Sequence, residues 1–551
     1  MSSIRSRGLA LALAVSMAFG LSACSSDDES GDASTSAATS VEYKDTFTWG
    51  VETEPASFNP FINSQDAAGP ILRSLYDAYF YLDGDGVYNP WLAESHEISA
   101  DNRTITIKIK QGITFSDGEK LDADAAILNF TRTQDPAIVE STTWAASLAS
   151  VEKIDEYTFK LVLKEPDTRL LERLSGSASA PISPKDFNLD VADLKLGVAI
   201  HGTGPYAITT YAKGEQVVLT ARDDYNWAPE ALTGRNGPAY TKTVIYRFLG
   251  EASTRSGALQ SGQVDAIDSV PSQDVALFVD DSKFQYAVFQ NGGTPYTLFF
   301  NVSRPPFDDI RVRQAIQLAV DIDTIVNAVY YGTAQAAKSP ISSASPFYDA
   351  SVALTPDVAK ANSLLDEAGY ATKDAEGYRV NAAGERLSIP IESNSLFVRD
   401  SRDILNQAIA GQIKELLGVD YTWKSVDGGT WSDNRANNTY VAWDNSVGAA
   451  DVANPLAVQY NSNPAIGFIN LGQIHDPKVD ELLATGQENF DFAIRKAAYV
   501  ELQHYVLVEQ AYVLPLVIMR HSHAAAADAT GFLSDPARGA NWGAYNVRVP
   551  K

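Results

Sequence analysis

The sequence predicts an α/β protein with more than one sheet. Three observations lead to this class: segments in which apolar and polar residues alternate, longer segments with an apolar helical stripe, and a mixture of both kinds along the chain. The chain has 551 residues, of which 45% are apolar. A chain of this length and composition buries a large core and divides into two or three domains.

Two segments are expected to be half-buried strands. In 103–110, isoleucines at every second position share one face, and in 157–164 alternate apolar side chains do the same. A period of two residues is the spacing of side chains on one face of a strand. Each strand is therefore expected to cover a core with one face and to meet water with the other.

Helical spacing is clearest later in the chain. An apolar stripe over 312–329 predicts one helix, preceded by Asp308 and Asp309 as capping acids. Gly369 and Gly418 follow two further stripes and suit left-handed C-terminal caps. The other expected helices are 359–368, 403–417 and 493–509.

The start of the chain predicts export. Arg5 and Arg7 precede an apolar stretch over 8–20, which is the layout of a secretory signal and is too short to span a bilayer. Leu21-Ser22-Ala23-Cys24 resembles a bacterial lipobox. The resemblance implies lipidation of Cys24, which is the only cysteine of the sequence, and a membrane contact through the lipid anchor alone.

Charge excludes one class of partner. Removal of Arg5 and Arg7 with the signal lowers the basic side chains from 43 to 41 against 69 acidic ones, so the formal charge changes from −26 to −28. Nucleic acid binding needs clustered Lys and Arg, so no nucleic acid is expected as a partner. Residues 25–40 are polar and small, which predicts a flexible spacer.

The order of short motifs resembles the family 5 extracellular solute-binding proteins, the dipeptide, oligopeptide and nickel-chelate receptors of ABC importers. The most specific segment is 113–121, Ile-Thr-Phe-Ser-Asp-Gly-Glu-Lys-Leu, in which Asp117-Gly118 is expected to form a tight turn. Other motifs follow in the family's order and extend the resemblance over nearly the whole chain. They are 54–60, 75–77, 91–95, 202–206, 258–265, 300–315 and 364–370.

The resemblance implies a two-lobed fold of the periplasmic-binding-protein kind, type II in its large form, in which a hinged cleft lies between the lobes. Crossings near Phe299–Asn301 and Glu509–Val513 are the expected hinges. The implied divisions are a signal peptide over 1–23, the lipidated cysteine and spacer over 24–40, lobe I over 41–79, 202–296 and 511–551, an inserted subdomain of lobe I over 80–201, and lobe II over 297–510.

The family's peptide receptors place an acid, shortly after a Trp-containing strand, against the ligand's ammonium group. Matching this pattern to Trp443 gives Asp451 as the ammonium partner, although the spacing is longer than in the family and leaves Asp444 as an alternative. Either acid also suits the cap of a turn or helix. Asn445 lies in the same segment and is expected to line the site.

Further ligand contacts are implied by position. Trp431 is expected to form an aromatic wall and Arg435 to bind the far carboxylate of a peptide, with a core Trp and a surface Arg as the alternative. Tyr296 offers a hydroxyl to the peptide backbone or is simply a packed strand residue. Asn63 and Ser64 are expected to line the lobe I side of the cleft.

The resemblance therefore implies a monomeric receptor that delivers di- or oligopeptides to the permease and ATPase subunits of an ABC importer. The alternative ligands are a nickel chelate, haem or another small solute. An enzyme, for instance a secreted glycoside hydrolase, is a remote alternative, because no catalytic motif organises the carboxylates. His521-Ser522-His523 is interpreted as a surface pair, so no metal site and no cofactor are expected.

Overall fold

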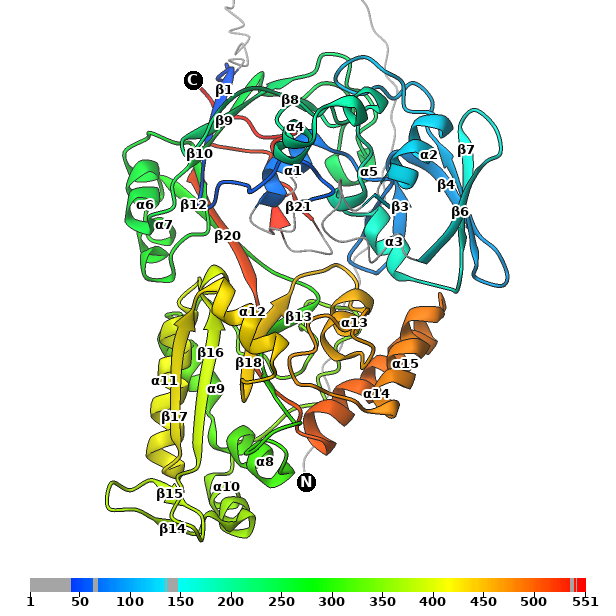
Figure 1. Cartoon of the computed structure of the whole chain (residues 1–551). Coiled ribbons are helices and arrows are strands. Elements are labelled where there is room, and N and C mark those ends of the chain that lie inside the picture. The colour runs from blue at the N-terminus through cyan, green and yellow to red at the C-terminus, as the bar shows by residue number, and fades with distance from the viewer. Residues whose placement is uncertain (1–40, 63–67, 133, 136–146, 536–539, 542) are drawn as a thin grey trace, which may run out of the picture. The chain divides into compact units, whose positions relative to one another are not determined.

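The computed structural model describes residues 41–62, 68–132, 134–135, 147–535, 540–541 and 543–551. Residues 43–551 form one compact unit, in which strands and helices mix from start to end, as the sequence predicts. Figure 1 shows this unit. Cys24, Asn63 and Ser64 lie outside the described residues, so the expectations placed on them stay predictions.

The first sheet has seven strands in the order β12-β20-β11-β1-β10-β9-β8. Its central strand β1 runs parallel to β10 and β11, and helix α6 makes the crossover between those two. Trp49 of β1 stacks on Tyr246 of β10 with ring centroids 5.8 Å apart. The bounds are β1 Thr46–Val51, β8 Tyr206–Ala212, β9 Gln216–Ala221, β10 Thr243–Phe248, α6 Ala252–Gln260, β11 Ala266–Asp268, β12 Phe284–Gln290 and β20 Arg520–Ala526.

One histidine of this sheet differs from the prediction of a surface pair. His523 of β20 is 3% exposed and its ring stacks on Phe532 with centroids 4.7 Å apart. β20 lies between β11 and β12, so the strand is interior to the sheet and one of its faces packs in the core. Among the described residues, no group of three or more His, Cys, Asp or Glu side chains could hold a metal ion.

The second sheet has four antiparallel strands in the order β4-β5-β7-β6 and carries both strands expected from alternation. The isoleucines of β5 are fully buried on one face, where they pack with Phe159 of β7 and Phe130 of helix α2. Gly118 has φ +87°, and Phe115 and Leu121 on either side of its turn are both buried. The bounds are β4 Ala93–Ile98, β5 Thr104–Ile109, α2 Ala123–Arg132, β6 Leu148–Lys153, β7 Thr158–Leu163 and α3 Arg169–Leu174.

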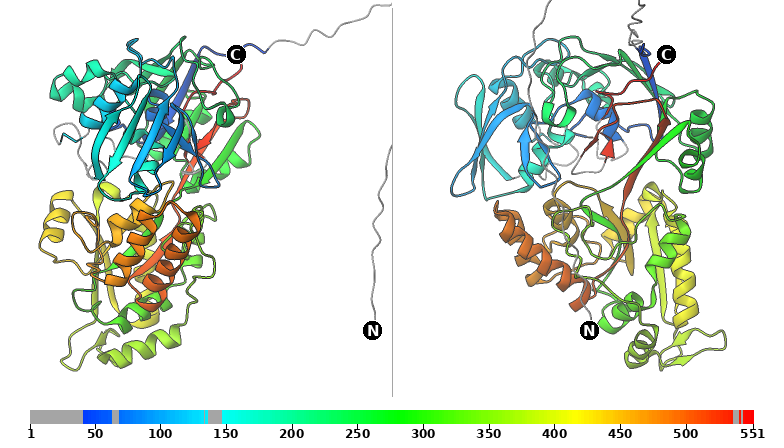
Figure 2. Two further views of the ribbon diagram at one scale, coloured as in Figure 1. Left: turned by 90° about the vertical axis from the view of Figure 1, so that its right-hand side faces the viewer. Right: turned by 180° about the vertical axis from the view of Figure 1, so that it is seen from behind.

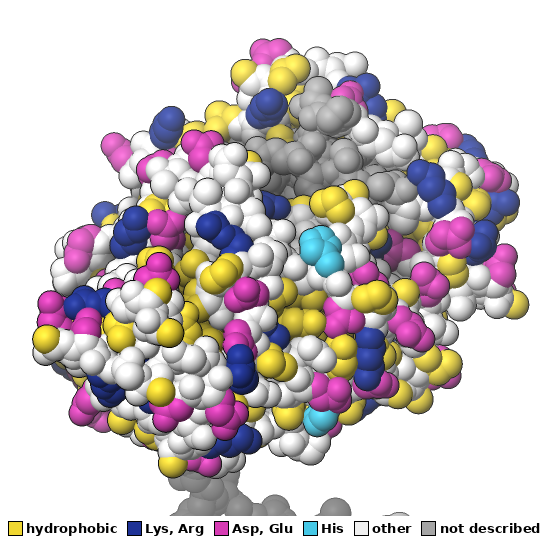
Figure 3. Space-filling view, turned by 60° about the horizontal axis from the view of Figure 1, so that its bottom comes forward, with side chains coloured by type: hydrophobic (Ala, Val, Ile, Leu, Met, Phe, Trp, Pro, Cys, Tyr) yellow, Lys and Arg dark blue, Asp and Glu magenta, His cyan; other side chains and the backbone are white. Residues whose placement is uncertain are grey.

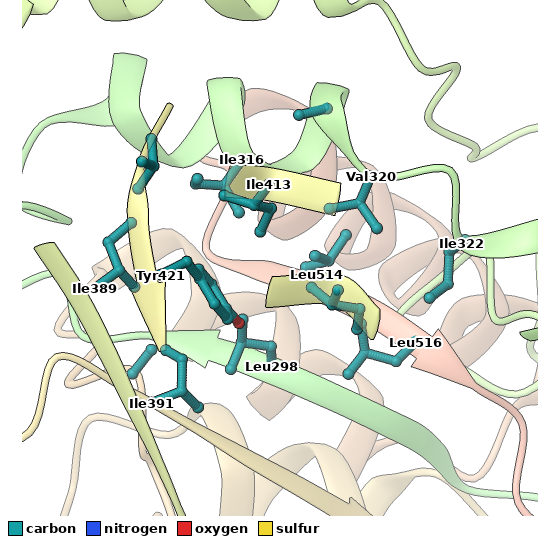
Figure 4. Close-up of a cluster of buried hydrophobic side chains, with 14 of the residues drawn as sticks. Leu298, Ile316, Val320, Ile322, Ile389, Ile391, Ile413, Tyr421, Leu514 and Leu516 are labelled. Atoms are coloured by element: carbon teal, nitrogen blue, oxygen red, sulfur yellow. The ribbon is translucent and has the colours of Figure 1, made fainter. Parts of the chain in front are cut away.

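The third sheet has three strands, β18-β13-β19, and covers the largest core cluster. Every residue of β13 is buried, because both faces of the strand are covered. Figure 4 shows Leu298 of β13 and Leu514 of β19 among side chains from α8, α11 and the parallel pair β16–β17. The bounds are β13 Thr294–Phe300, β16 Ser388–Asn394, β17 Asp420–Val426, β18 Ala442–Val447 and β19 Val513–Val517.

The helix predicted over 312–329 is two helices. Val320 is extended between them, and the Asp321 side chain accepts a hydrogen bond from the Thr324 N–H at 3.1 Å, which starts a new helix. Both helices pack on the same core, so the apolar stripe continues from one to the other. Apolar periodicity alone therefore did not reveal the break between them. The bounds are α8 Ile310–Ala319 and α9 Ile322–Val329.

The other expected helices are confirmed. Gly418 ends α11 in the left-handed conformation with φ +69°, as expected from its position. Figures 1 and 2 show α14 and α15 lying side by side. The bounds are α10 Val358–Leu365, α11 Arg402–Leu417, α12 Gly428–Ala436, α13 Ala453–Tyr460, α14 Pro477–Glu488 and α15 Phe492–His504. Shorter elements are α1 Gly69–Leu75, β2 Phe80–Leu82, β3 Tyr88–Pro90, α4 Val191–Leu196, α5 Glu230–Thr233, α7 Ala276–Val279, β14 Thr372–Lys373, β15 Arg379–Val380, β21 Ser534–Asp535 and β22 Ala540–Asn541.

The chain crosses between the seven-stranded and three-stranded sheets at 291–293 and at 518–519, not at the points expected from the family pattern. Phe299 pairs with Trp443 and Val513 inside the three-stranded sheet, so the expected crossings there are corrected. The motif Phe300-Asn301 lies at the end of β13. The sequence pattern marks this strand end, and the prediction placed a lobe boundary there. We propose to move the two lobe boundaries to these crossings.

The two crossings are tied together. The Asn291 N–H donates to the Met519 carbonyl at 2.8 Å. Gly293 has φ +80°, and a Cβ atom there would lie 2.3 Å from the Val447 carbonyl oxygen. Only glycine lets the backbone approach β18 this closely.

Asp77 is a fully buried carboxylate between α1 and β2. The Trp227 Nε1–H donates to it at 2.8 Å and the Tyr225 hydroxyl at 3.2 Å. Burial raises the pKa of Asp77 to about 7, which these hydrogen bonds and Arg222 only partly oppose.

The surface carries both signs of charge. Figure 3 shows acidic and basic side chains interspersed with hydrophobic ones on one face of the molecule. Among the described residues, no helix has the length and apolar character that a membrane span requires.

The core cluster in Figure 4 predicts a large cost of truncation. Leu298→Ala is expected to lower the free energy of unfolding by about 2 to 5 kcal/mol, because it leaves a cavity in a closed core. Denaturant unfolding measures the change. Leu396→Ala is the control, since Leu396 is 74% exposed; an equal loss in both variants would contradict the assignment of the core.

Asp77 predicts a pH dependence with a defined sign. Because its folded pKa lies above the ordinary value of 3.8, its contribution to stability is complete below about pH 4 and is lost as the pH rises through about 7. The loss is about 4 kcal/mol for a shift of this size. Asp77→Asn should remove this part of the pH slope in thermal unfolding measured from pH 4 to pH 8, whereas the exposed Asp85→Asn should keep it.

Candidate functional site

Three of the predicted aromatic and basic residues lie together. Trp443 of β18 is fully buried, stacks on Tyr440 with centroids 4.1 Å apart, and lies 4.9 Å from the Trp431 ring. Arg435 of α12 holds its guanidinium 5.4 Å over the Trp431 ring. Trp443 is therefore a core residue, and Trp431 with the half-buried Arg435 forms the outer part of the same stack.

Asp444 points to the opposite face of β18 and is enclosed by polar side chains. Its Oδ2 accepts a hydrogen bond from the Ser393 hydroxyl and a longer one, 3.4 Å, from the Asn406 amide. The Tyr296 hydroxyl also bonds to Asp444 and accepts from Asn406 at 3.0 Å. Burial raises the pKa of Asp444, an effect that these hydrogen bonds and Arg402 only partly offset.

Asp451 precedes α13 and already has a cationic partner. It is 4% exposed, and its Oδ1 accepts from Arg495 of α15 at 2.5 Å and from the Ala453 N–H at 2.9 Å. The buried carboxylate beside Arg495 raises the pKa of that guanidinium against the opposing effect of burial. Asp451 therefore holds α13 against α15 and caps a turn, which is the alternative that the sequence left open.

Asn445 lies on the same face as Trp443. Its side-chain oxygen accepts from the Gln459 amide of α13 at 2.9 Å. The other side-chain oxygen in this contact, Oε1 of Gln459, is buried and has no hydrogen-bond partner among the described residues. The Gln459 Oε1 atom therefore remains available as a hydrogen-bond acceptor.

The structure adds one residue that the sequence did not single out. Arg173, at the end of α3, reaches the Asn454 side-chain oxygen of α13 at 3.5 Å, the limit of a hydrogen bond. Its Nε is buried with no partner among the described residues, and burial lowers the pKa of Arg173. Next to it, Arg169 is paired with Asp167 through two bonds of 2.7 and 2.9 Å.

A backbone hydrogen bond joins the same two parts of the chain. The Thr168 N–H donates to the Gln487 carbonyl of α14 at 2.8 Å. Thr168 Oγ1 and Gln487 Nε2 are both buried and lack a partner among the described residues. We call the segments 167–173 and 451–454 the Arg173 junction. At this junction α3 and the residue before it contact α13 and α14.

The only sequence signal for Arg173 was its position four residues after Arg169 on a short helix. Such a pair is usually two solvated cations on one helix face. The difference between them arises from Asp167, which neutralises Arg169 alone, and from α13, which is nearly 300 residues away in the sequence.

Comparisons with known proteins agree with this architecture. A family model described as bacterial extracellular solute-binding proteins, family 5 middle, matches residues 87–465. The glutathione-binding protein GsiB of Escherichia coli strain K12 is 25% identical over 485 residues, which cover 88% of this chain and 91% of that protein.

Two solved structures are similar to this chain over nearly their whole length. NikA from Brucella suis, in complex with Fe(III)-EDTA, has a TM-score of 0.77 at 23% identity and covers 92% of this chain and 100% of that chain. The oligopeptide-binding protein AppA from Bacillus subtilis, in complex with a nonapeptide, has a TM-score of 0.73 at 22% identity and covers 91% and 98%. These matches confirm the two-lobed α/β fold class expected from the sequence.

The ion pair at Asp451 predicts a strong effect on stability. Asp451→Ala is expected to lower the free energy of unfolding by about 3 to 5 kcal/mol, because it leaves the buried Arg495 without its carboxylate. Glu94→Ala breaks the exposed pair with Lys108 and should cost less than about 1 kcal/mol. Denaturant unfolding of both variants measures the difference; equal small losses would show that Asp451 is not a structural partner.

Proposed function

Because the chain belongs to the bacterial extracellular solute-binding proteins of family 5, we propose that it captures di- or oligopeptides and delivers them to the permease of an ABC importer. The observation that carries the choice of ligand is the Arg173 junction. A partly buried guanidinium with a buried, unpartnered Nε and one weak contact there suits a group of opposite charge.

The carboxylate of a peptide fits Arg173. A guanidinium offers several N–H donors in a planar fork that matches the two oxygens of a carboxylate. In the described residues, Arg173 has no ion pair, whereas its neighbour Arg169 is bound to Asp167. Arg173 therefore takes the role of carboxylate partner that the sequence assigned to Arg435, which stacks on Trp431.

The surroundings of Asp451 and Asp444 decide which of the two acids we propose as the partner of the peptide's ammonium group. Asp451 lies three residues before Asn454 of α13, the residue that Arg173 contacts, whereas Asp444 is enclosed by Ser393, Tyr296 and Asn406. We therefore retain Asp451 rather than Asp444 as the acid closer to the ligand. Asp451 also binds Arg495, so its charge is shared between the ligand and the fold.

Recognition of the two termini of a peptide explains how one receptor can bind peptides of many sequences. The constant parts of a peptide are its charged ends and its backbone, and varied side chains are accommodated in pockets where water fills the gaps. A glutathione-binding relative and a peptide-bound neighbour support a ligand of this kind, since glutathione is itself a small peptide with two carboxylates.

The remaining parts of the proposal follow from the family and from the start of the sequence. The chain is exported, anchored to the outer face of the cell membrane through lipid on Cys24, and acts as a monomer without catalysis. Separate ATPase subunits drive import after the lobes close on the ligand. Ligand contacts with both lobes favour the closed state.

Uptake of a metal chelate is the second candidate. The similar NikA structure holds Fe(III)-EDTA, and an EDTA complex presents carboxylates to which Arg173 is equally suited. In the part of the chain that the structure describes, no side-chain group is complete enough to hold the metal itself. A metal would therefore enter only inside its chelator.

Peptides with a free or an amidated C-terminus test the proposal. Arg173→Gln is expected to weaken binding of a free-acid peptide by about 10- to 100-fold, because a charge-assisted hydrogen bond is lost. Binding of the amidated peptide should be nearly the same as in the unaltered chain. Calorimetric titration with glutathione and with short peptides measures both affinities.

Arg169→Gln is the matched control, since it removes the same charge from the same helix. It should retain the preference for the free acid. If no peptide binds the unaltered chain and an EDTA chelate does, the second candidate replaces the first. If peptides bind but the two Arg variants behave alike, the receptor function stands and the role of Arg173 is wrong.

A further inference from the structure

Two arginines and three tyrosines alternate in a strip that reaches the surface near the start of β1. The Arg548 guanidinium lies 4.6 Å from the centroid of the Tyr43 ring and 4.6 Å from that of the Tyr240 ring. The Arg235 guanidinium lies 4.0 Å from the centroid of Tyr240 and 4.8 Å from that of Tyr545. We call these five residues, in the order Tyr545, Arg235, Tyr240, Arg548 and Tyr43, the Arg–Tyr ladder. None of them belongs to the Arg173 junction.

The seven-stranded sheet brings the ladder together. β1 and β10 are parallel neighbours that pair from their first residues, so the segments that lead into them, with Tyr43 and Tyr240, start at the same end of the sheet. Tyr43 also pairs with Pro550 in an isolated β-bridge, which places Arg548 beside both tyrosines. Figure 1 shows β1 and the C-terminus at the end of this unit opposite α10. The ladder therefore lies on lobe I, far from the three-stranded sheet.

Both arginines of the ladder are cations without a carboxylate partner among the described residues. Arg548 Nε donates to the Thr530 hydroxyl at 3.3 Å, and its two terminal nitrogens make no hydrogen bond in that part of the chain. Arg235 donates to the carbonyl of Pro238, which is neutral. The Arg548 guanidinium therefore keeps its two terminal nitrogens available for a further acceptor.

The acidic side chains at the start of β1 have lysine partners of their own. Asp45 binds Lys242 at 3.0 Å, and Asp265 binds Lys44 at 2.8 Å. Glu42, which precedes the ladder in the chain, is exposed and adds one negative charge. The two arginines still leave a positive charge at this place, on a chain whose formal net charge is −26. Because salt screens exposed charges beyond about 10 Å at 0.1 M, the local charge dominates a contact here.

We propose that the Arg–Tyr ladder binds the phosphate groups of anionic lipids at the outer face of the membrane, with Arg548 as the phosphate contact. The planar fork of an arginine matches two oxygens of a phosphate. Tyrosine favours the boundary between lipid headgroups and water, because its ring is apolar and its hydroxyl is polar. Tyr240 is 48% exposed and presents both parts to the surface. The ladder thus offers both kinds of contact in one strip.

The place of the ladder in the chain favours a membrane over another anionic partner. This step rests on the part of the proposed function that puts a lipid on Cys24. A flexible chain between Cys24 and Tyr43 spans roughly 25 Å on average, so an anchored protein holds the ladder near the headgroups at a high effective concentration. Contact through the ladder would hold this end of the seven-stranded sheet against the membrane and so orient lobe I on it.

A single fluorescent label tests the contact. Cys24 is the only cysteine, so in the chain from residue 25 onward Thr46→Cys, at the exposed start of β1, carries the only thiol for an environment-sensitive dye. An N-terminal histidine tag tethers this chain to phosphatidylcholine vesicles that contain a nickel-chelating lipid, with or without phosphatidylglycerol. Stronger, blue-shifted emission is expected only with phosphatidylglycerol, and high salt should abolish it. Equal emission from both kinds of vesicle would overturn the proposal.

Variants and a second label position assign the contact to the ladder. Arg548→Gln in the labelled Thr46→Cys chain should lower the emission change about fivefold, because one arginine near an anionic surface is lost. Arg103→Gln is the matched control, since it removes one exposed charge beside the four-stranded sheet, and should leave the change intact. A dye on Ile154→Cys, 54% exposed between β6 and β7, should not respond to any vesicle. Equal losses in the two arginine variants, or equal responses at the two label positions, would contradict the proposal.

Glu42→Gln gives a result in the opposite direction. Removal of this negative charge should increase the emission change with phosphatidylglycerol several-fold, a gain that a chain without its fold could not show. An unchanged or weaker response would count against an anionic partner. Peptide titration of Arg548→Gln should match that of the unaltered chain, because the ladder lies outside the Arg173 junction. The vesicle experiment uses neither a peptide nor a lipid on Cys24, so its failure is distinct from a failure of the receptor function.

Discussion

The close approach of the two crossing segments is the constraint on which the arrangement of this protein depends. The Asn291 N–H donates to the Met519 carbonyl, so the outgoing and returning segments run together. Gly293 then presses its backbone against the Val447 carbonyl, a contact that any Cβ atom would prevent. β13 enters its sheet at this point with β18 and β19 on either side, and the alternate side chains of β13 fill two different cores.

Buried charges mark the places where function and fold meet. Asp451 with Arg495 and Asp444 with its ring of hydroxyl and amide donors are satisfied within the chain. Arg173 is not, because in the described residues no acidic side chain lies within ion-pair distance of it and its one side-chain contact is with Asn454 at 3.5 Å. An unpaired guanidinium that is partly buried is costly, and the carboxylate of the proposed peptide ligand would offset that cost at Arg173.

The sequence predicted the local structure around the candidate residues but not what surrounds them in space. The segment from Trp443 to Asp451 forms β18 and the loop after it, and a strand followed by small and acidic residues is a pattern that the sequence reveals. The sequence did not reveal the partners of either acid. Alternation assigns Asp444 to one face of the strand, but it does not show that Ser393 and Asn406 bind its carboxylate. Asp451 looked equally free, because its partner Arg495 lies 44 residues further on in α15.

The sequence by itself determined the fold class, the family and most local elements, down to the turn at Gly118 and the cap at Gly418, because periodicity and turn chemistry are local properties. It did not determine where the chain passes between sheets or how one apolar stripe divides into α8 and α9. Only the tertiary structure decided which arginines are neutralised and which are not. A charge is paired by its neighbours in space: Asp451 pairs with Arg495 of α15, whereas the one side-chain contact of Arg173 is with the neutral Asn454 of α13.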